Sequence, residues 1–135
     1  MVGGRYKVVS LIAEGGMGRV YLAEQDMGGA SRRVAIKVLL SQYSVRKADV
    51  ARFMRECSTV SQLEHPNTIK FYDYGETDEG DLYIAMEFVR GRSLARELAE
   101  HGILSPERVD LIIGQICGSL QEAHDKGIIL SLIHI

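Results

Sequence analysis

The order in which this sequence changes its hydrophobic period constrains its fold most. Three stretches before residue 40 and two after residue 67 are rich in β-branched and aromatic residues, as strands are. Between them, residues 45–63 place apolar side chains three and four positions apart, which is typical of one helix face. From residue 93 onward the pattern is helical. This order predicts an α+β fold: a five-stranded antiparallel sheet with one inserted helix, followed by two helices.

The boundaries follow from local signals. We expect strands at 6–12, 19–23, 33–39, 68–74 and 82–89, and helices at 45–63, 93–100 and 105–127. The first helix should end at His65-Pro66-Asn67, because the residue before a proline is pushed out of the α region. An acidic turn, residues 76–81, joins the last two strands. The last helix should bury one apolar stripe: Val109, Ile112, Ile113, Ile116, Leu120 and Ala123.

Length and composition exclude several classes of protein. The 135 residues fit one ordinary domain or a piece of a larger one. With 46% hydrophobic and 25% charged residues, a disordered tail, a collagen-like fibre or a polybasic nucleic-acid arm is excluded. The longest apolar run, residues 127–135, is far shorter than the ~20 residues that cross a bilayer, and no signal peptide opens the chain. Cys57 and Cys117 form no metal-binding or disulfide pattern, so we expect two buried thiols in a cytosolic protein.

Three features could carry chemistry. The glycines Gly15, Gly16 and Gly18 would let backbone N–H groups approach phosphate oxygens closely. Lys37 interrupts an otherwise apolar strand and needs an anion or a water-facing edge. Glu56 lies in the helix that follows. Taken singly, each has a simpler explanation: an ordinary hairpin turn, a lysine that extends to solvent from an edge strand, and a surface glutamate.

Charge is distributed unevenly along the chain. The first 60 residues carry ten basic and five acidic residues, and the remainder carries six and thirteen. A basic first half would suit a polyanionic ligand such as a nucleotide, but from charge alone a solvated surface is the better explanation.

Together and in this order, the motifs resemble the amino-terminal lobe of the protein kinase family, in particular its bacterial Ser/Thr members. The family signature G-x-G-x-x-G-x-V corresponds to Ala13, Gly15, Gly18 and Val20, and V-A-I-K is intact at residues 34–37. Residues 53–56 resemble the helix segment that carries the paired glutamate, and residues 65–67 resemble the break before the fourth strand. Residues 86–94 resemble the gatekeeper and hinge, and residues 118–129 resemble the long helix before the catalytic loop. The resemblance spans about residues 5–129.

The resemblance implies a role for each matching residue. Lys37 would hold the α- and β-phosphates of ATP, with Glu56 fixing its ammonium by an ion pair. Ala13, Gly15, Gly16 and Gly18 would form the loop over the phosphates. The adenine ring would pack on Val20, Ala35 and Leu94, and Met86 would limit the depth of its pocket. Backbone groups of Glu87 and Val89 would bind the edge of the ring. The helix would be stacked on the sheet by Val60 and Phe71.

Two departures from the family pattern matter. Ala13 replaces the first loop glycine, which costs ~1 kcal/mol only if that position needs a positive φ. After Ile129 the family continues with H-R-D-L-x-x-x-N and later D-F-G, whereas this chain reads Leu-Ser-Leu-Ile-His-Ile and stops. Those six residues are what CTG TCT CTT ATA CAC ATC encodes, a string that resembles a transposon end used in sequencing adapters. A divergent native terminus is the alternative.

We therefore expect an ATP-binding lobe at residues 5–89, a hinge exit and the start of the helical lobe at 90–129, and a non-native tail at 130–135. The resemblance implies a cytoplasmic serine/threonine kinase that transfers the γ-phosphoryl group of ATP to protein hydroxyls, with Mg²⁺ in the full-length parent. The fragment itself should be inactive, since the catalytic base is absent, and it should contain no metal site and bind no nucleic acid or membrane. A downstream membrane anchor and Tyr specificity stay open. The alternatives are a non-catalytic nucleotide-binding pseudokinase or scaffold module, and a small α+β binding domain whose motifs arose by chance.

Overall fold

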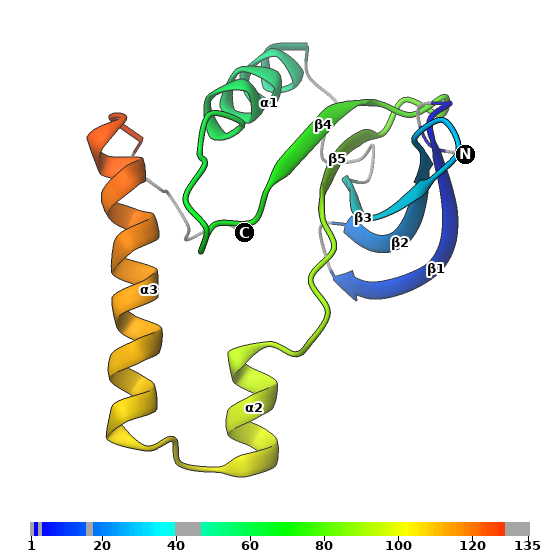
Figure 1. Ribbon diagram of the computed structural model, residues 1–135. Helices are drawn as coiled ribbons and strands as arrows, with labels where there is room; N and C mark the ends of the chain where they lie inside the picture. The colour runs from blue at the N-terminus through cyan, green and yellow to red at the C-terminus, as the bar shows by residue number, and fades with distance from the viewer. Residues whose placement is uncertain (1, 3, 16–17, 40–46, 129–135) are drawn as a thin grey trace. The chain divides into compact units, whose positions relative to one another are not determined.

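The computed structural model describes residues 2, 4–15, 18–39 and 47–128, and it has the α+β architecture that the sequence predicts (Figure 1). The elements are β1 (Tyr6–Gly15), β2 (Gly18–Asp26), β3 (Ser31–Leu39), α1 (Lys47–Val60), β4 (Phe71–Glu76), β5 (Leu82–Glu87), α2 (Leu94–His101) and α3 (Pro106–Asp125). The five strands form one antiparallel sheet in the order β1-β2-β3-β5-β4.

The chain divides into two compact units. The first unit comprises residues 1–62 and 70–88, and so contains the whole sheet and α1. The second unit comprises residues 63–69 and 89–135, and so contains α2, α3 and the short segment between α1 and β4. Segment 63–69, which lies between α1 and β4 in the sequence, is thus grouped with α2 and α3.

The core of the first unit lies on one face of the sheet. Val34, Ile36 and Val38 alternate along β3 and are buried, as expected for residues two apart on one strand face. They pack with buried residues of the neighbouring strands: Ala23 on β2, Tyr83 and Ala85 on β5, and Tyr6 on β1. The nearly continuous apolar character of β3 follows from its central place in the sheet.

A polar contact links the two outer strands. The Tyr6 hydroxyl at the start of β1 donates a hydrogen bond to the Asp73 carboxylate in β4 (3.2 Å), and Arg5 forms an ion pair with the same carboxylate (2.9 Å). The Tyr6 ring meets the ring of Tyr83 edge-on at 6.2 Å between centroids. Since β1 and β4 lie at opposite ends of the strand order, this contact draws the sheet around its own core.

Two strand boundaries differ from the prediction. β1 and β2 extend to Gly15 and Gly18, which are paired with each other, so these glycines belong to the strand ladder. β4 begins at Phe71 instead of Thr68, because the preceding segment is bound to α3. The Thr68 hydroxyl lies 2.5 Å from the Ser119 hydroxyl in α3.

The segment before β4 is held mainly by one carboxylate. Glu122 in α3 accepts hydrogen bonds from the backbone N–H groups of Glu64 (2.9 Å) and His65 (3.1 Å). The His65 ring lies so close to Gly118 that a Cβ there would be 2.8 Å from its Nε2 atom. A glycine in the middle of α3 is therefore explained by the close approach of this ring.

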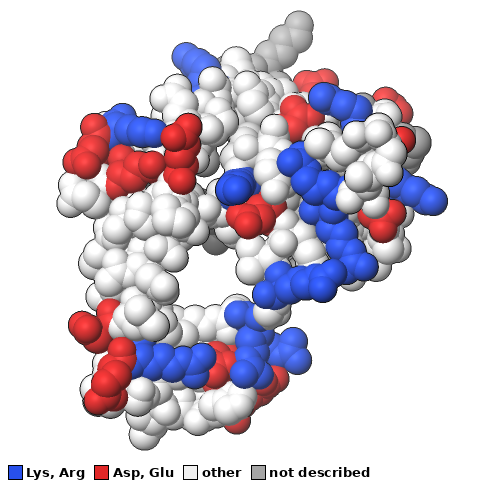
Figure 2. All heavy atoms as spheres, viewed as in Figure 1, with Lys and Arg blue, Asp and Glu red and all other residues white. Residues whose placement is uncertain are grey.

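An ion pair between Glu97 and Arg108 joins α2 to α3. Both helices begin at serine N-caps, Ser93 and Ser105, as the sequence indicates. Glu97 of α2 is buried, pairs closely with Arg92 and accepts a hydrogen bond from Arg108 of α3 (2.8 Å). The bond from Arg108 lowers the pKa of Glu97. Figure 2 shows acidic and basic side chains side by side over α2, at the foot of the view.

The predicted buried stripe of α3 is wrong at three of its six positions. Within it, Ala123 is buried and Ile112 and Leu120 are half-buried. Val109, Ile113 and Ile116 are 43–52% exposed, because no described element of the second unit covers that face. The expectation of two buried thiols also fails, because Cys57 is buried whereas Cys117, in α3, is exposed. None of the described helices has the length and apolar character needed to cross a membrane.

Candidate nucleotide site

Lys37 lies on the sheet face opposite the core. In the antiparallel register it stands across from Val20 of β2 and Ile84 of β5. Residues directly opposite each other point to the same side of a sheet, and side chains two apart on one strand share a face. Ala35, which stands across from Met86, therefore shares this face with Lys37.

The register thus places four of the predicted site residues together: Val20, Ala35, Lys37 and Met86. Ala35 is buried, and the other three are half-buried. One ammonium group beside a small, partly covered apolar surface suits a ligand with a flat apolar part and an anionic part. This is the mixture of apolar lining and few polar groups typical of small-ligand sites.

The glycine hairpin joins β1 to β2. Ala13 stands across from Val20, and no described residue other than glycine has a positive φ. Alanine in place of the family glycine therefore costs no backbone strain. A Cβ on Gly18 would overlap the carbonyl oxygen of Val38, whereas nothing lies within 4 Å of one on Gly15. Gly16 lies outside the described residues.

Glu56 is not bound to Lys37 in this structure. The carboxylate of Glu56 is 67% exposed and pairs with Arg52 one turn earlier in α1 at 3.3 Å. No ion pair joins Lys37 to any acidic side chain in the part of the chain that the structure describes. The next residue, Cys57, is buried, and burial followed by the charge of Glu56 raises the pKa of its thiol to about 11. The ion pair between Lys37 and Glu56 stays a prediction.

α1 contacts the sheet through β4. Val60 is the last residue of α1, Phe71 is the first of β4, and both are half-buried. The stacking role that the resemblance implies for these two residues stays a prediction.

The hinge residues divide between the two units. The backbone N–H of Glu87 donates to the carbonyl oxygen of Lys70 (2.8 Å), and the Glu87 carboxylate accepts from the Lys70 N–H (3.1 Å). The carbonyl is therefore the backbone group that Glu87 could offer a ligand. Val89 and Leu94 belong to the second unit and are 59% and 44% exposed.

Asp73 and Glu122 were not predicted as structural residues, although these two carboxylates bind residues at least 57 positions away along the chain. Local patterns give no signal for such contacts. The mid-helix glycine Gly118 was the available hint of a close approach to α3. Among the described residues, no group of three or more His, Cys, Asp or Glu side chains could hold a metal ion.

Comparison with known proteins identifies the family. Residues 6–131 match the protein kinase domain, so the chain belongs to the protein kinase family. It is 40% identical to the serine/threonine-protein kinase pkn3 of Myxococcus xanthus over 125 residues, 93% of this chain and 22% of that protein. It is 38% identical to the serine/threonine-protein kinase PrkC of Bacillus subtilis over 128 residues, 95% of this chain and 19% of that protein.

Solved structures agree with this assignment. The crystal structure of the Mycobacterium tuberculosis PknI kinase domain superposes with a TM-score of 0.79 and 31% sequence identity, covering 94% of this chain and 51% of that one. The chain therefore spans about half of a kinase domain and about a fifth of the full-length relatives. The resemblance inferred from the motifs is confirmed, and so is the position of the chain in the amino-terminal part of the domain.

Proposed function

We propose that residues 5–89 form the ATP-binding lobe, and residues 90–129 the hinge exit and start of the helical lobe, of a cytoplasmic serine/threonine kinase. The complete domain would transfer the γ-phosphoryl group of ATP to hydroxyl groups of a protein substrate. The sequence of residues 130–135, which lie outside the described residues, favours a non-native tail. The observation that carries the proposal is the register that sets Val20, Ala35, Lys37 and Met86 on one sheet face.

Each part of that face has a task. Val20 and Ala35 would pack on one side of the adenine ring and Leu94 on the other, while Met86 would limit how deep the ring enters. Backbone groups of Glu87 and Val89 would bind the adenine edge. The ammonium of Lys37 would neutralise the α- and β-phosphates, and Gly15, Gly16 and Gly18 would let backbone N–H groups approach them. ATP supplies the transferable group, and Mg²⁺ in the complete protein would be held by family residues that this sequence lacks.

For an ion pair to form between Lys37 and Glu56, the Glu56 side chain must leave its present partner. Glu56 is exposed, and its present partner Arg52 is an i,i+4 surface neighbour. Such pairs contribute only ~0.3–0.5 kcal/mol, so little opposes an exchange of partners. We propose that Glu56 turns to Lys37 when phosphates bind, because the ammonium then gains a second anion and needs fixing in one position.

The test uses the complete kinase domain of the parent protein and two matched variants. Lys37→Met should weaken the binding of a fluorescent ATP analogue and abolish transfer of labelled phosphate to a general protein substrate. Lys7→Met changes an exposed lysine at the far end of the hairpin, across from Glu24, and should leave both unchanged.

The alternatives predict other outcomes. A wild-type domain that binds the analogue but transfers no phosphate would favour the pseudokinase or scaffold function. If Lys37→Met left nucleotide binding unchanged while the circular dichroism spectrum was preserved, the nucleotide site would be wrongly placed. In that case the motifs would be accidental features of another binding domain.

A further inference from the structure

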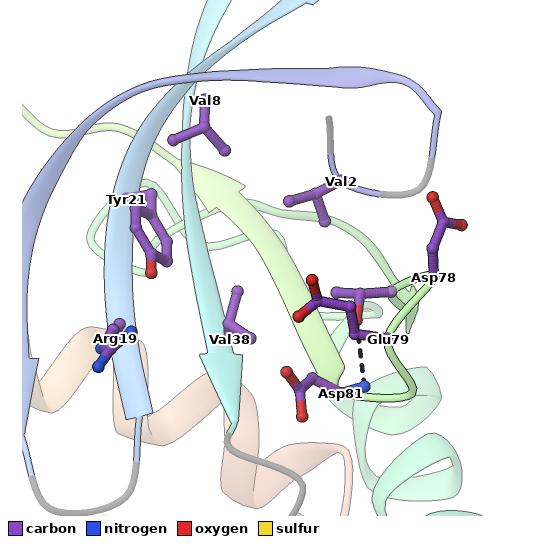
Figure 3. A pocket seen from close by; sticks show the side chains of 9 residues that line it. Val2, Val8, Arg19, Tyr21, Val38, Asp78, Glu79 and Asp81 are labelled. Carbon is purple, nitrogen blue, oxygen red and sulfur yellow. Dashed lines mark hydrogen bonds between the residues drawn. The ribbon is translucent and has the colours of Figure 1, made fainter.

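A cavity lies on the other face of the sheet. Arg19 stands directly across from Val38, and Tyr21 follows two positions later on β2. These residues alternate with Val20 and Lys37, so they belong to the core face and not to the candidate nucleotide face. The cavity has a volume of about 380 Å³ and is lined by residues of the first unit alone (Figure 3).

The cavity has one apolar wall and one acidic wall. Val8, Tyr21 and Val38 supply apolar surface from β1, β2 and β3. The acidic wall is the turn 77–81 between β4 and β5.

The acidic turn has a fixed shape. The N–H of Thr77 donates to the carbonyl oxygen of Asp81 (2.7 Å), and the N–H of Asp81 donates to the Thr77 hydroxyl (3.1 Å). Figure 3 shows the carboxylates of Glu79 and Asp81 directed toward the strands and that of Asp78 directed away. All three acidic residues line the cavity, but only Glu79 and Asp81 direct their carboxylates toward the strands.

The acidic charge is not compensated within the described residues. No ion pair among them involves Asp78, Glu79 or Asp81. Arg19 is the one basic residue among the described residues of the lining, and its guanidinium is paired with Glu14 at 2.9 Å. The cavity thus combines net negative charge with an apolar wall.

We propose that this cavity is a docking site for a basic segment of a protein partner, with an arginine or lysine next to an aliphatic residue. The aliphatic stem of the basic side chain would lie along Val8 and Tyr21, and its cationic end would meet Glu79 and Asp81. Long basic side chains bury their stems and keep their charge at a polar edge in this way. The volume lies at the lower end of ligand sites, ~300–1,000 Å³, which suits one or two side chains. The acidic wall disfavours nucleotides and phosphates.

The experiment titrates the full 135-residue chain into a fluorescein-labelled heptapeptide in which two arginines alternate with valine and leucine. Fluorescence anisotropy should show saturable binding that weakens as salt rises, because the contact is electrostatic at its rim. The double variant Glu79→Gln/Asp81→Asn should weaken binding about tenfold. Asp78→Asn, on the same turn but directed away, should change it less than about twofold.

Three results would overturn the proposal. One is equal weakening by Asp78→Asn and by the double variant, which would indicate a diffuse charge effect. Another is displacement by spermidine as effective as by the unlabelled peptide, since a polyamine supplies charge without the aliphatic neighbour. The third is concentration-dependent self-association that the double variant abolishes, which would identify a second copy as the occupant. Glu79→Lys, with unchanged circular dichroism, should abolish binding even if the milder variants prove too weak to resolve.

Discussion

The two units of this chain are stabilised by different means. Ten buried apolar residues of the first unit lie in the sheet and α1, whereas among the described residues of the second unit only Ala123 and Ile128 are buried apolar residues. The second unit depends instead on carboxylates: Glu97 between α2 and α3, and Glu122 between α3 and segment 63–69. Apolar burial contributes far more to stability than ion pairs and hydrogen bonds that have at least one partly exposed partner. The first unit should therefore unfold at a higher denaturant concentration than the second.

The largest expected effect is a cavity in the sheet core. Ile36→Ala, at a fully buried position, should lower the free energy of unfolding of the first unit by ~3 kcal/mol. Ile113→Ala, 52% exposed on α3, should change stability by less than ~0.5 kcal/mol. All six tyrosines lie in the first unit, so tyrosine fluorescence during urea unfolding measures Ile36→Ala, and circular dichroism, which also reports on the helices of the second unit, measures Ile113→Ala. Equal losses from the two variants would contradict the comparison.

The next effect comes from close packing at the glycine hairpin. Gly18→Ala would drive a methyl group against the Val38 carbonyl and should cost ~2 kcal/mol, since the backbone of β3 must move. Gly15→Ala, across the ladder with open space around it, is the matched control. The same urea titration measures both, and the account of this hairpin fails if Gly15→Ala proves as costly as Gly18→Ala.

A local effect is expected in the second unit. Glu122→Ala removes the acceptor for two backbone N–H groups, those of Glu64 and His65, and should lower local stability by ~1.5 kcal/mol. Hydrogen exchange at these two amides should accelerate about tenfold, while amides of β3 keep their protection. Unchanged exchange at both amides would mean that Glu122 does not hold this segment.

The smallest effect concerns the link between the outer strands. Tyr6→Phe removes the hydrogen bond to Asp73 and should cost ~1 kcal/mol at neutral pH. Burial, and then Asp73, raise the pKa of the Tyr6 hydroxyl to about 12 from an ordinary value of 10.0. The folded state holds this proton more tightly than the unfolded state does. The contribution of the Tyr6 hydroxyl to the free energy of unfolding is therefore fully present below pH 10 and falls as pH rises toward 12.

The measurement is the urea midpoint at pH 9 and at pH 11.5 for wild type and for Tyr6→Phe. The variant should lose less stability between the two values than the wild type does. Cys57 also titrates in this range, with a pKa of about 11, so a Cys57→Ala background is the control for both proteins. Parallel loss in the two proteins would mean that Tyr6 does not contribute to the alkaline decline.

The strands of the sheet and the position of Lys37 could be predicted because they depend on local alternation. A strand with three alternating buried residues, Val34, Ile36 and Val38, specifies its own faces, and Lys37 must then point to the other one. The start of β4 could not be predicted, because Glu122 holds the preceding segment from 57 positions away. The exposure of Cys117 was missed for a related reason: a helical period tells which face is apolar but not whether anything covers it.

The position of Glu56 is the site feature that sequence reasoning could least settle. Its neighbour Cys57 marks the buried side of α1, and a helix turns 100° per residue, so a small rotation of α1 decides what Glu56 faces. In this structure the partner is Arg52. Motif spacing identifies Lys37 and Glu56 as the two residues of the expected ion pair, but it does not give the rotation of α1, which carries Glu56.

The central claim is that the sheet face bearing Lys37 binds the nucleotide. A lysine-reactive adenosine analogue, incubated with the full chain or the complete domain and mapped by mass spectrometry, tests it most directly. We predict modification concentrated at Lys37 and suppressed by excess ATP, with Lys7 and Lys70 labelled weakly and without protection. Uniform labelling of the exposed lysines, or labelling of Lys37 that ATP does not suppress, would contradict the account.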